Sequence, residues 1–321
     1  MIRRVIYISI FVLFLSSPMP SLAQTLDKQS ALKQALLNNP SYKAALLEIE
    51  AAAGERSQAS LLPNPSTVFE IENIGGSGQR EGFERTEITL SLQQKIELAG
   101  KRRLRTDVAD YGYKINQEEA IAQALKLLSE TEFAFIRMAV AKERIQLADN
   151  RLQLAYQTQE IVRKRVDAAA SPDFQLEKTN IEMTEAKIEK HHVEEEYKFA
   201  RNDLARLLVL KNADDLYIDV DLSVLPKLTD HQDLIAALKS APQSRAQEFA
   251  KMKAKSSLDL AKANGVPDPT VGIGVRQYFD NDDTALVAEL SMPLPFFDRN
   301  QGAIKSAHAN VVRTGAQASA L

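Results

Sequence analysis

Apolar and polar side chains follow two different periods along this chain, and each period predicts a different element. They alternate residue by residue over 67–74, 86–94, 270–278 and 285–292, which is the period of a β-strand with two unlike faces. From residue 99 the apolar positions instead recur at spacings of three and four for about 70 residues, which predicts a long helix with a narrow, coiled-coil-like stripe. A break at 168–173 and a returning helix over 173–209 complete a helical hairpin, with Ser171 as the predicted cap and Pro172 as the first helical residue.

The same features recur in the same order about 200 residues apart. Each copy has a helix interrupted at a proline (Pro40 and Pro242), then a Pro-x-Pro stretch (63–65 and 267–269), then two alternating segments. We interpret this as a duplication, with a first repeat over residues 24–212 and a connector plus second repeat over 213–321. Residues 1–23 have the basic start, short apolar run and small-residue end of a signal peptide.

The alternating segments separate an apolar from a polar face. The predicted lipid-facing residues are Phe69, Ile71, Ile88, Leu90 and Leu92, and the predicted lumen-facing residues are Glu70, Glu72, Glu87, Thr89 and Ser91. A soluble β-sandwich gives similar alternation, but segments of about nine residues also suit strands that cross a bilayer. A barrel filled by side chains needs about eight strands, so four require several copies, and three copies supply about twelve. The fold class predicted is therefore mainly α with a small β part: a long coiled-coil hairpin plus two strand hairpins that contribute to an oligomeric outer-membrane β-barrel and a periplasmic α-barrel.

Composition narrows the chemistry. The 40 Lys and Arg against 43 Asp and Glu argue against a nucleic-acid partner, and the absence of Cys excludes disulfides and thiolate chemistry. Neither a phosphate-binding glycine loop nor a serine nucleophile elbow occurs, so we expect no enzyme, no cofactor and no metal site. His191 and His192 lie on a charged helix, so we expect both side chains to be exposed to solvent. Glu70, Glu72 and Glu87 are expected to make the lumen tolerant of cations.

Several stretches resemble a known family when taken in order. Residues 62–65 (LPNP), 94–102 (QKIELAGKR) and 293–302 (PLPFFDRNQG), with the repeat and the long hairpin, are similar to the TolC-like outer-membrane efflux family, nearest to its cobalt–zinc–cadmium resistance branch. The resemblance implies a homotrimer in outer-membrane lipid that joins a periplasmic adaptor and an inner-membrane pump of the heavy-metal RND type. It implies adaptor contact at the hairpin tip, through Arg165, Asp167, Ala168, Ser171, Pro172 and Asp173.

Two differences from that family are visible. The family usually has Gly where this chain has Ala168 or Ala169, and its second long hairpin has no counterpart before Leu321, as in a fragment or a truncated product. The function expected is a passive channel subunit of a tripartite efflux pump for heavy-metal cations or other toxic solutes, in the outer membrane with its helices in the periplasm. The alternative is a soluble periplasmic coiled-coil adaptor or scaffolding protein.

Overall fold

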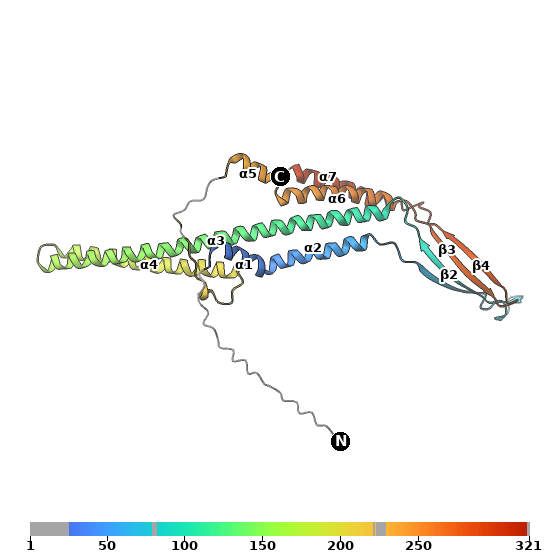
Figure 1. The fold of residues 1–321 in the computed structure, drawn as a ribbon, viewed down its shortest axis with the longest axis horizontal. Coiled ribbons are helices and arrows are strands. Elements are labelled where there is room, and N and C mark those ends of the chain that lie inside the picture. The colour runs from blue at the N-terminus through green and yellow to red at the C-terminus, as the bar shows by residue number, and fades with distance from the viewer. Residues whose placement is uncertain (1–25, 79–81, 221, 223–228, 320–321) are drawn as a thin grey trace, which may run out of the picture. The chain divides into compact units, whose positions relative to one another are not determined.

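A computed structural model describes residues 26–78, 82–220, 222 and 229–319 (Figure 1). The predicted signal peptide over residues 1–23 lies outside the described residues. The chain forms two compact units: Met1–Ala35 with Glu130–Leu225, and Leu36–Ser129 with Pro226–Leu321. Helix α3 (Lys101–Asp167) runs through both units.

The first two helices meet at the predicted proline. Helix α1 covers Lys28–Asn38 and α2 covers Pro40–Ala59. Asn39 between them is extended, and its side chain accepts a hydrogen bond from Ser41 N at 2.9 Å. Pro40 then supplies a first helical position that needs no N–H donor. The interruption predicted from the sequence is confirmed.

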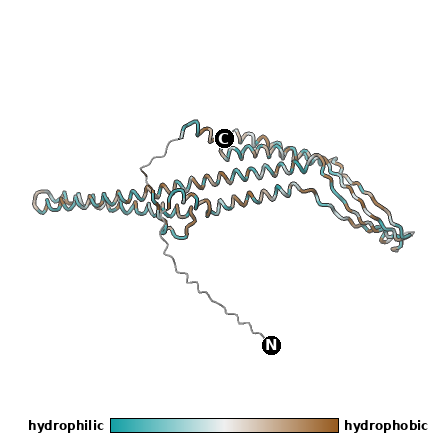
Figure 2. The backbone as a smooth tube through the Cα atoms, in the orientation of Figure 1, coloured by the Kyte–Doolittle hydropathy of each residue, from teal (hydrophilic) through white to brown (hydrophobic). Residues whose placement is uncertain are grey.

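Helices α3 and α4 (Asp173–Leu207) form the predicted hairpin. The 67 residues of α3 correspond to a helix on the order of 100 Å long. Within the first unit, buried residues recur at seven-residue spacing: Ala134, Ala141 and Ala148 on α3, and Thr179, Ala186 and Val193 on α4. The larger Phe135 and Met138 on α3 and Leu204 on α4 are also fully buried. Figure 2 shows hydrophobic and hydrophilic residues interleaved along both helices, as a narrow seam requires.

One capping prediction is wrong. The residue that precedes α4 is Pro172, with extended φ and ψ and no side-chain capping bond, so Ser171 does not cap this helix. The Pro172 carbonyl accepts from Gln175 N at 3.0 Å, so Pro172 precedes the helix and the first helical residue is Asp173, where the predicted range 173–209 begins. Asp173 in the first turn still complements the helix dipole.

Four strands form one antiparallel sheet in the order β1-β2-β3-β4: β1 Ser66–Glu72, β2 Glu87–Lys95, β3 Thr270–Tyr278 and β4 Thr284–Ser291. β1 ends two residues before the predicted boundary because Asn73 has a positive φ of 55°. The central pair β2–β3 joins segments from the two halves of the chain. The sheet thus places side chains far apart in the sequence on one surface.

The remaining elements are helical. Helices α5 (His231–Lys239), α6 (Pro242–Asn264) and α7 (Gln301–Ser319) belong to the second unit, where α6 packs against α7. A short 3-10 turn, η2, covers Ala213–Asp215 in the first unit. Leu26 and Ile218 make one isolated parallel β-bridge in the first unit. Within the described part of the chain, no helix combines the length and the hydrophobicity that crossing a membrane requires.

Candidate functional site

The sheet has two chemically different faces. Its register pairs Glu70 with Thr89 and Glu72 with Glu87, and it pairs Phe69 with Leu90 and Ile71 with Ile88. Because paired residues share a face, the residues predicted to face the lumen lie together and those predicted to face lipid lie on the other side. The register thus separates the two groups onto opposite faces of the sheet; their assignment to lumen and lipid stays a prediction.

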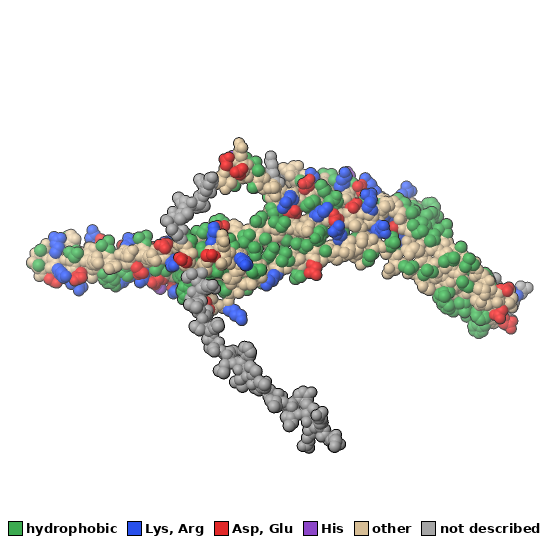
Figure 3. Space-filling view, in the orientation of Figure 1, with side chains coloured by type: hydrophobic (Ala, Val, Ile, Leu, Met, Phe, Trp, Pro, Cys, Tyr) green, Lys and Arg blue, Asp and Glu red, His purple; other side chains and the backbone are tan. Residues whose placement is uncertain are grey.

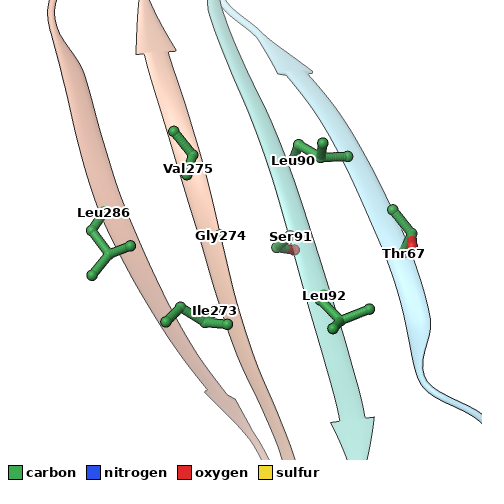
Figure 4. Close-up of a pocket in the computed structure, with 8 residues that line it drawn as sticks. All are labelled: Thr67, Leu90, Ser91, Leu92, Ile273, Gly274, Val275 and Leu286. Atoms are coloured by element: carbon green, nitrogen blue, oxygen red, sulfur yellow. The ribbon is translucent and has the colours of Figure 1, made fainter.

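The apolar face is open. Leu90, Leu286 and Leu290 are 55%, 74% and 76% exposed. A shallow groove of about 450 Å³ crosses this part of the sheet, lined by Thr67, Leu90, Ser91, Leu92, Ile273, Gly274, Val275 and Leu286 (Figure 4). In Figure 3 hydrophobic side chains gather over the strands, whereas charged side chains are spread over the helices. A soluble sheet buries its apolar face, so this surface requires an apolar environment.

The polar face holds an ion-pair network that the sequence analysis missed. Arg276 Nη2 lies 2.8 Å from Glu72 Oε2, and Arg276 Nη1 lies 3.0 Å from Glu87 Oε2. Arg276 Nε donates to Thr89 Oγ1 at 2.8 Å. Asn73 Nδ2 donates to the other oxygen of Glu87 at 2.9 Å. Two of the three carboxylates expected to attract cations therefore share one guanidinium.

Two glycines shape the rest of this face. Gln93 Nε2 on β2 donates to Glu289 Oε2 on β4 at 2.5 Å, across the intervening Gly272. A Cβ at Gly274 would lie 2.6 Å from Ser91 Cβ, so only glycine fits there. Both glycines therefore leave room for the side chains of the neighbouring strands.

Ionic contacts fasten the strands to the helices of the second unit. Asp268, just before β3, accepts from Lys101 Nζ at 2.6 Å and from Leu98 N at 2.9 Å, and both side chains of the pair are under one-tenth exposed. Burial raises the pKa of Asp268, but the hydrogen bonds from Lys101 and Leu98 outweigh it and hold that pKa below its ordinary value. Lys101 Nζ also donates to Val266 O at 2.6 Å.

A second ion pair lies at the same junction. Arg105 Nη1 donates to Glu97 Oε1 at 2.5 Å, and Arg105 Nη2 donates to Glu97 Oε2 at 3.1 Å. The Arg105 nitrogens also donate to the carbonyls of Ala59 and Leu61 at 2.9 Å and 3.0 Å. The hydrogen bond from Arg105 holds the pKa of Glu97 below its ordinary value. This pair therefore ties the start of α3 to the end of α2.

The hairpin tip is a tight, mostly exposed turn. Ala169 has a left-handed φ of 52°, and its N–H donates to Val166 O at 2.8 Å while Ala170 N donates to Arg165 O at 2.8 Å. This is the backbone pattern that usually ends on glycine. Of the six predicted tip residues, Ser171 is half-buried and the other five are exposed. Their contact with an adaptor stays a prediction.

Large apolar side chains also lie on the outside of the hairpin. On α3 they recur every seven residues and are between 43% and 69% exposed: Phe133, Val140, Leu147, Leu154 and Ile161. On α4 three more, between 61% and 65% exposed, follow the same spacing: Phe174, Ile181 and Ile188. The sequence analysis recognised one coiled-coil seam, and the structure separates it from these additional stripes. A seven-residue apolar repeat on an exposed surface is typical of a helix that packs against another helix.

The histidine pair lies on α4, as predicted. His192 Nε2 lies 3.3 Å from Glu196 Oε1, one turn further along the helix, and the His192 side chain is 64% exposed. Among the residues that the structure describes, no group of three or more His, Cys, Asp or Glu side chains is arranged to hold a metal ion. His231 is the first residue of α5, where Asp230 Oδ1 accepts from its backbone N at 2.7 Å.

The family model of outer membrane efflux proteins matches residues 31–209, more than half of the chain. The chain belongs to this family. Its members serve as conduits rather than enzymes, in line with the expectation that the protein has no catalytic site. The resemblance found in the sequence is thereby confirmed, together with the mainly helical fold class with a small sheet.

Curated relatives and solved structures agree with the family. The cobalt-zinc-cadmium resistance protein CzcC of Cupriavidus metallidurans is 25% identical, over 89% of this chain and 66% of CzcC. The nickel and cobalt resistance protein CnrC of the same organism is 26% identical, over 89% of this chain and 68% of CnrC. The chain therefore spans about two thirds of the length of these relatives. The outer membrane channel CmeC of Campylobacter jejuni shares the fold, with a TM-score of 0.74 and 15% identity over 91% of this chain and 66% of CmeC.

Proposed function

We propose that this protein is a subunit of an outer-membrane efflux conduit. The observation that carries the proposal is the sheet, whose apolar face is open while Thr89 and Ser91 on its polar face are 2% and 3% exposed. In water this arrangement would leave the apolar face exposed, which is unfavourable. In a barrel the apolar face meets lipid and the polar face lines the passage. The protein then acts as a passive path, and a partner pump supplies the driving force.

The conduit requires several copies, and we propose three. A sheet of four strands leaves two edges whose backbone groups cannot remain unpaired in lipid, so neighbouring copies must pair with them. The exposed stripes on α3 and α4 supply a matching surface in the helical part, where each stripe meets a helix of a neighbour.

Heavy-metal cations are the proposed substrate class. CzcC and CnrC are named for resistance to cobalt, zinc, cadmium and nickel, and this chain resembles both along most of its length. The proposed partners are a periplasmic adaptor at the hairpin tip and an inner-membrane pump of the heavy-metal RND type. The described residues carry no cluster suited to hold a metal, which is compatible with a conduit that passes ions without storing them.

The other candidate is a soluble periplasmic adaptor or scaffolding protein. The long hairpin of α3 and α4 fits both functions. An adaptor, however, requires a β-part with its apolar side chains inside, and here those of β2 and β4 are outside. The exposed leucines therefore favour the conduit.

Fractionation of cells that express the protein, followed by native mass measurement in detergent, tests the proposal. We expect a trimer in the outer-membrane fraction. A variant with Leu147→Ser and Leu154→Ser should lose the trimer, while Gln146→Ser and Gln153→Ser on the neighbouring exposed positions should keep it. A monomer in the soluble periplasm would contradict the conduit and favour the scaffold.

A further inference from the structure

All charged side chains of the four strands lie on the polar face of the sheet. The register and the alternation of the strands place the following there: Glu70, Glu72, Glu87, Lys95, Arg276 and Glu289. Lys95 Nζ lies 3.4 Å from Asp268 Oδ2, at the end of the sheet next to the helices. Arg276 is therefore the one basic side chain of these described strands that lies among the carboxylates of the polar face.

Arg276 separates two carboxylates that would otherwise face each other. Glu72 and Glu87 are direct partners on adjacent strands, where like charges repel. The guanidinium pairs with both, and its Nε–H is used by Thr89. The carboxylate oxygens of Glu72 and Glu87 and the hydroxyl of Thr89 are of the ligand class that divalent cations prefer. The Arg276 guanidinium lies between these oxygen atoms and is bonded to all three side chains.

The other two carboxylates of this face are those of Glu70 and Glu289. Glu289 receives a hydrogen bond from the neutral Gln93 Nε2 at 2.5 Å. Within the described residues, no Lys, Arg or His nitrogen lies within 4.0 Å of the carboxylates of Glu70 or Glu289. The face is thus acidic overall, but its densest cluster of carboxylates is half neutralised.

We propose that Arg276 sets the charge selectivity of the conduit by preventing the Glu72–Glu87 pair from holding cations. Conduction requires that an ion be attracted strongly enough to enter and weakly enough to leave. The carboxylates of Glu70 and Glu289 attract cations into the passage. Arg276 keeps the Glu72–Glu87 pair from binding those cations tightly. This inference rests on the proposed function, since it assigns a role only within a conducting assembly.

Planar bilayers of phosphatidylethanolamine and phosphatidylglycerol under a KCl gradient test the assignment, with the purified protein as the conducting species. Arg276→Gln should raise the permeability ratio of K⁺ over Cl⁻ roughly two-fold or more, because it removes one positive charge per copy from the passage. It should also lower the Co²⁺ concentration that blocks half of the K⁺ current. Glu289→Gln should lower the permeability ratio instead.

Two further variants separate charge from structure. Arg276→Lys keeps the charge without the two-pronged geometry and should keep the wild-type ratio. The double variant Arg276→Gln with Glu72→Gln restores the wild-type net charge and should return the ratio toward wild type. If Arg276→Lys behaves like Arg276→Gln, the role is structural and the assignment is wrong. A conducting pore with an unchanged ratio in Arg276→Gln overturns the assignment alone, whereas a wild-type protein that forms no pore overturns the proposed function as well.

Discussion

Replacing Asp268 by alanine tests whether the ion pair at the strand-to-helix junction holds these elements together. The Asp268 carboxylate accepts from Lys101 Nζ at 2.6 Å and from Leu98 N at 2.9 Å. Its loss leaves the Lys101 ammonium, which is 6% exposed, with the carbonyl of Val266 as its remaining partner. Breaking a buried pair from one side costs about 3–5 kcal/mol. At roughly 2–4 °C per kcal/mol for a unit of this size, we expect the melting temperature to fall by about 10 °C.

The assay is thermal unfolding of the purified protein in detergent, followed by circular dichroism at one scan rate. Glu160→Gln is the matched control, because its pair with Lys164 is more than half exposed on both sides and its loss should leave the melting temperature nearly unchanged. The double variant Lys101→Met with Asp268→Leu should recover more than half of the loss, since no buried charge remains. A fall no larger than that of Glu160→Gln would refute the reasoning, as would a double variant as unstable as Asp268→Ala.

Acid should remove the same stabilisation. The pKa of folded Asp268 lies below the ordinary aspartate value of 3.8, so its contribution is complete above that pH and is lost as the pH falls through the folded pKa. Between about pH 5 and pH 2 the wild type should therefore lose more stability than the double variant Lys101→Met with Asp268→Leu. Equal losses in both proteins would show that Asp268 does not contribute to the acid response.

Three other substitutions test local features. Gly274→Val should destabilise the sheet by about 1–3 kcal/mol in the same melting assay, because its Cβ meets Ser91, whereas Gly315→Ala in an open helical position should not. Ala169→Gly should stabilise the hairpin turn by about 1 kcal/mol, measured as slower amide exchange at the tip, because Ala169 is left-handed. The pKa of folded Glu97 is lowered, so wild type should lose the stability contributed by Glu97 as the pH falls below the ordinary glutamate value of 4.5. Glu97→Gln lacks this carboxylate, so its melting temperature should fall less than that of wild type over the same pH range.

Much of the architecture could be predicted from periodicity. Alternation fixed which side chains of β1 and β2 share a face, and strand β3 was predicted with its observed bounds, 270–278. Helix spacing and the prolines predicted the hairpin and the interruption at Pro40. These features depend on local backbone geometry, which a sequence displays directly.

The interactions that were missed join distant parts of the chain. Arg276 meets Glu87 only because β2 pairs with β3 across about 190 positions, and Lys101 meets Asp268 across 167. No local pattern reveals such a pair, although the alternation of β3 does place Arg276 on the same face as Gly272 and Gly274. The wrong prediction that Ser171 caps α4 has another origin. The capping residue is the one just before the first helical residue, and here the first helical residue is Asp173 rather than Pro172.

Fluorescence quenching by brominated lipids is the most direct test of the central claim that the apolar face of the sheet meets membrane lipid. The chain has no cysteine, so Leu286→Cys and Glu70→Cys each introduce one labelling site, on opposite faces of the sheet. With a bimane label and reconstitution into brominated phosphatidylcholine, the account predicts strong quenching at position 286 and little at position 70. Equal quenching at the two positions, or stronger quenching at 70, would contradict it.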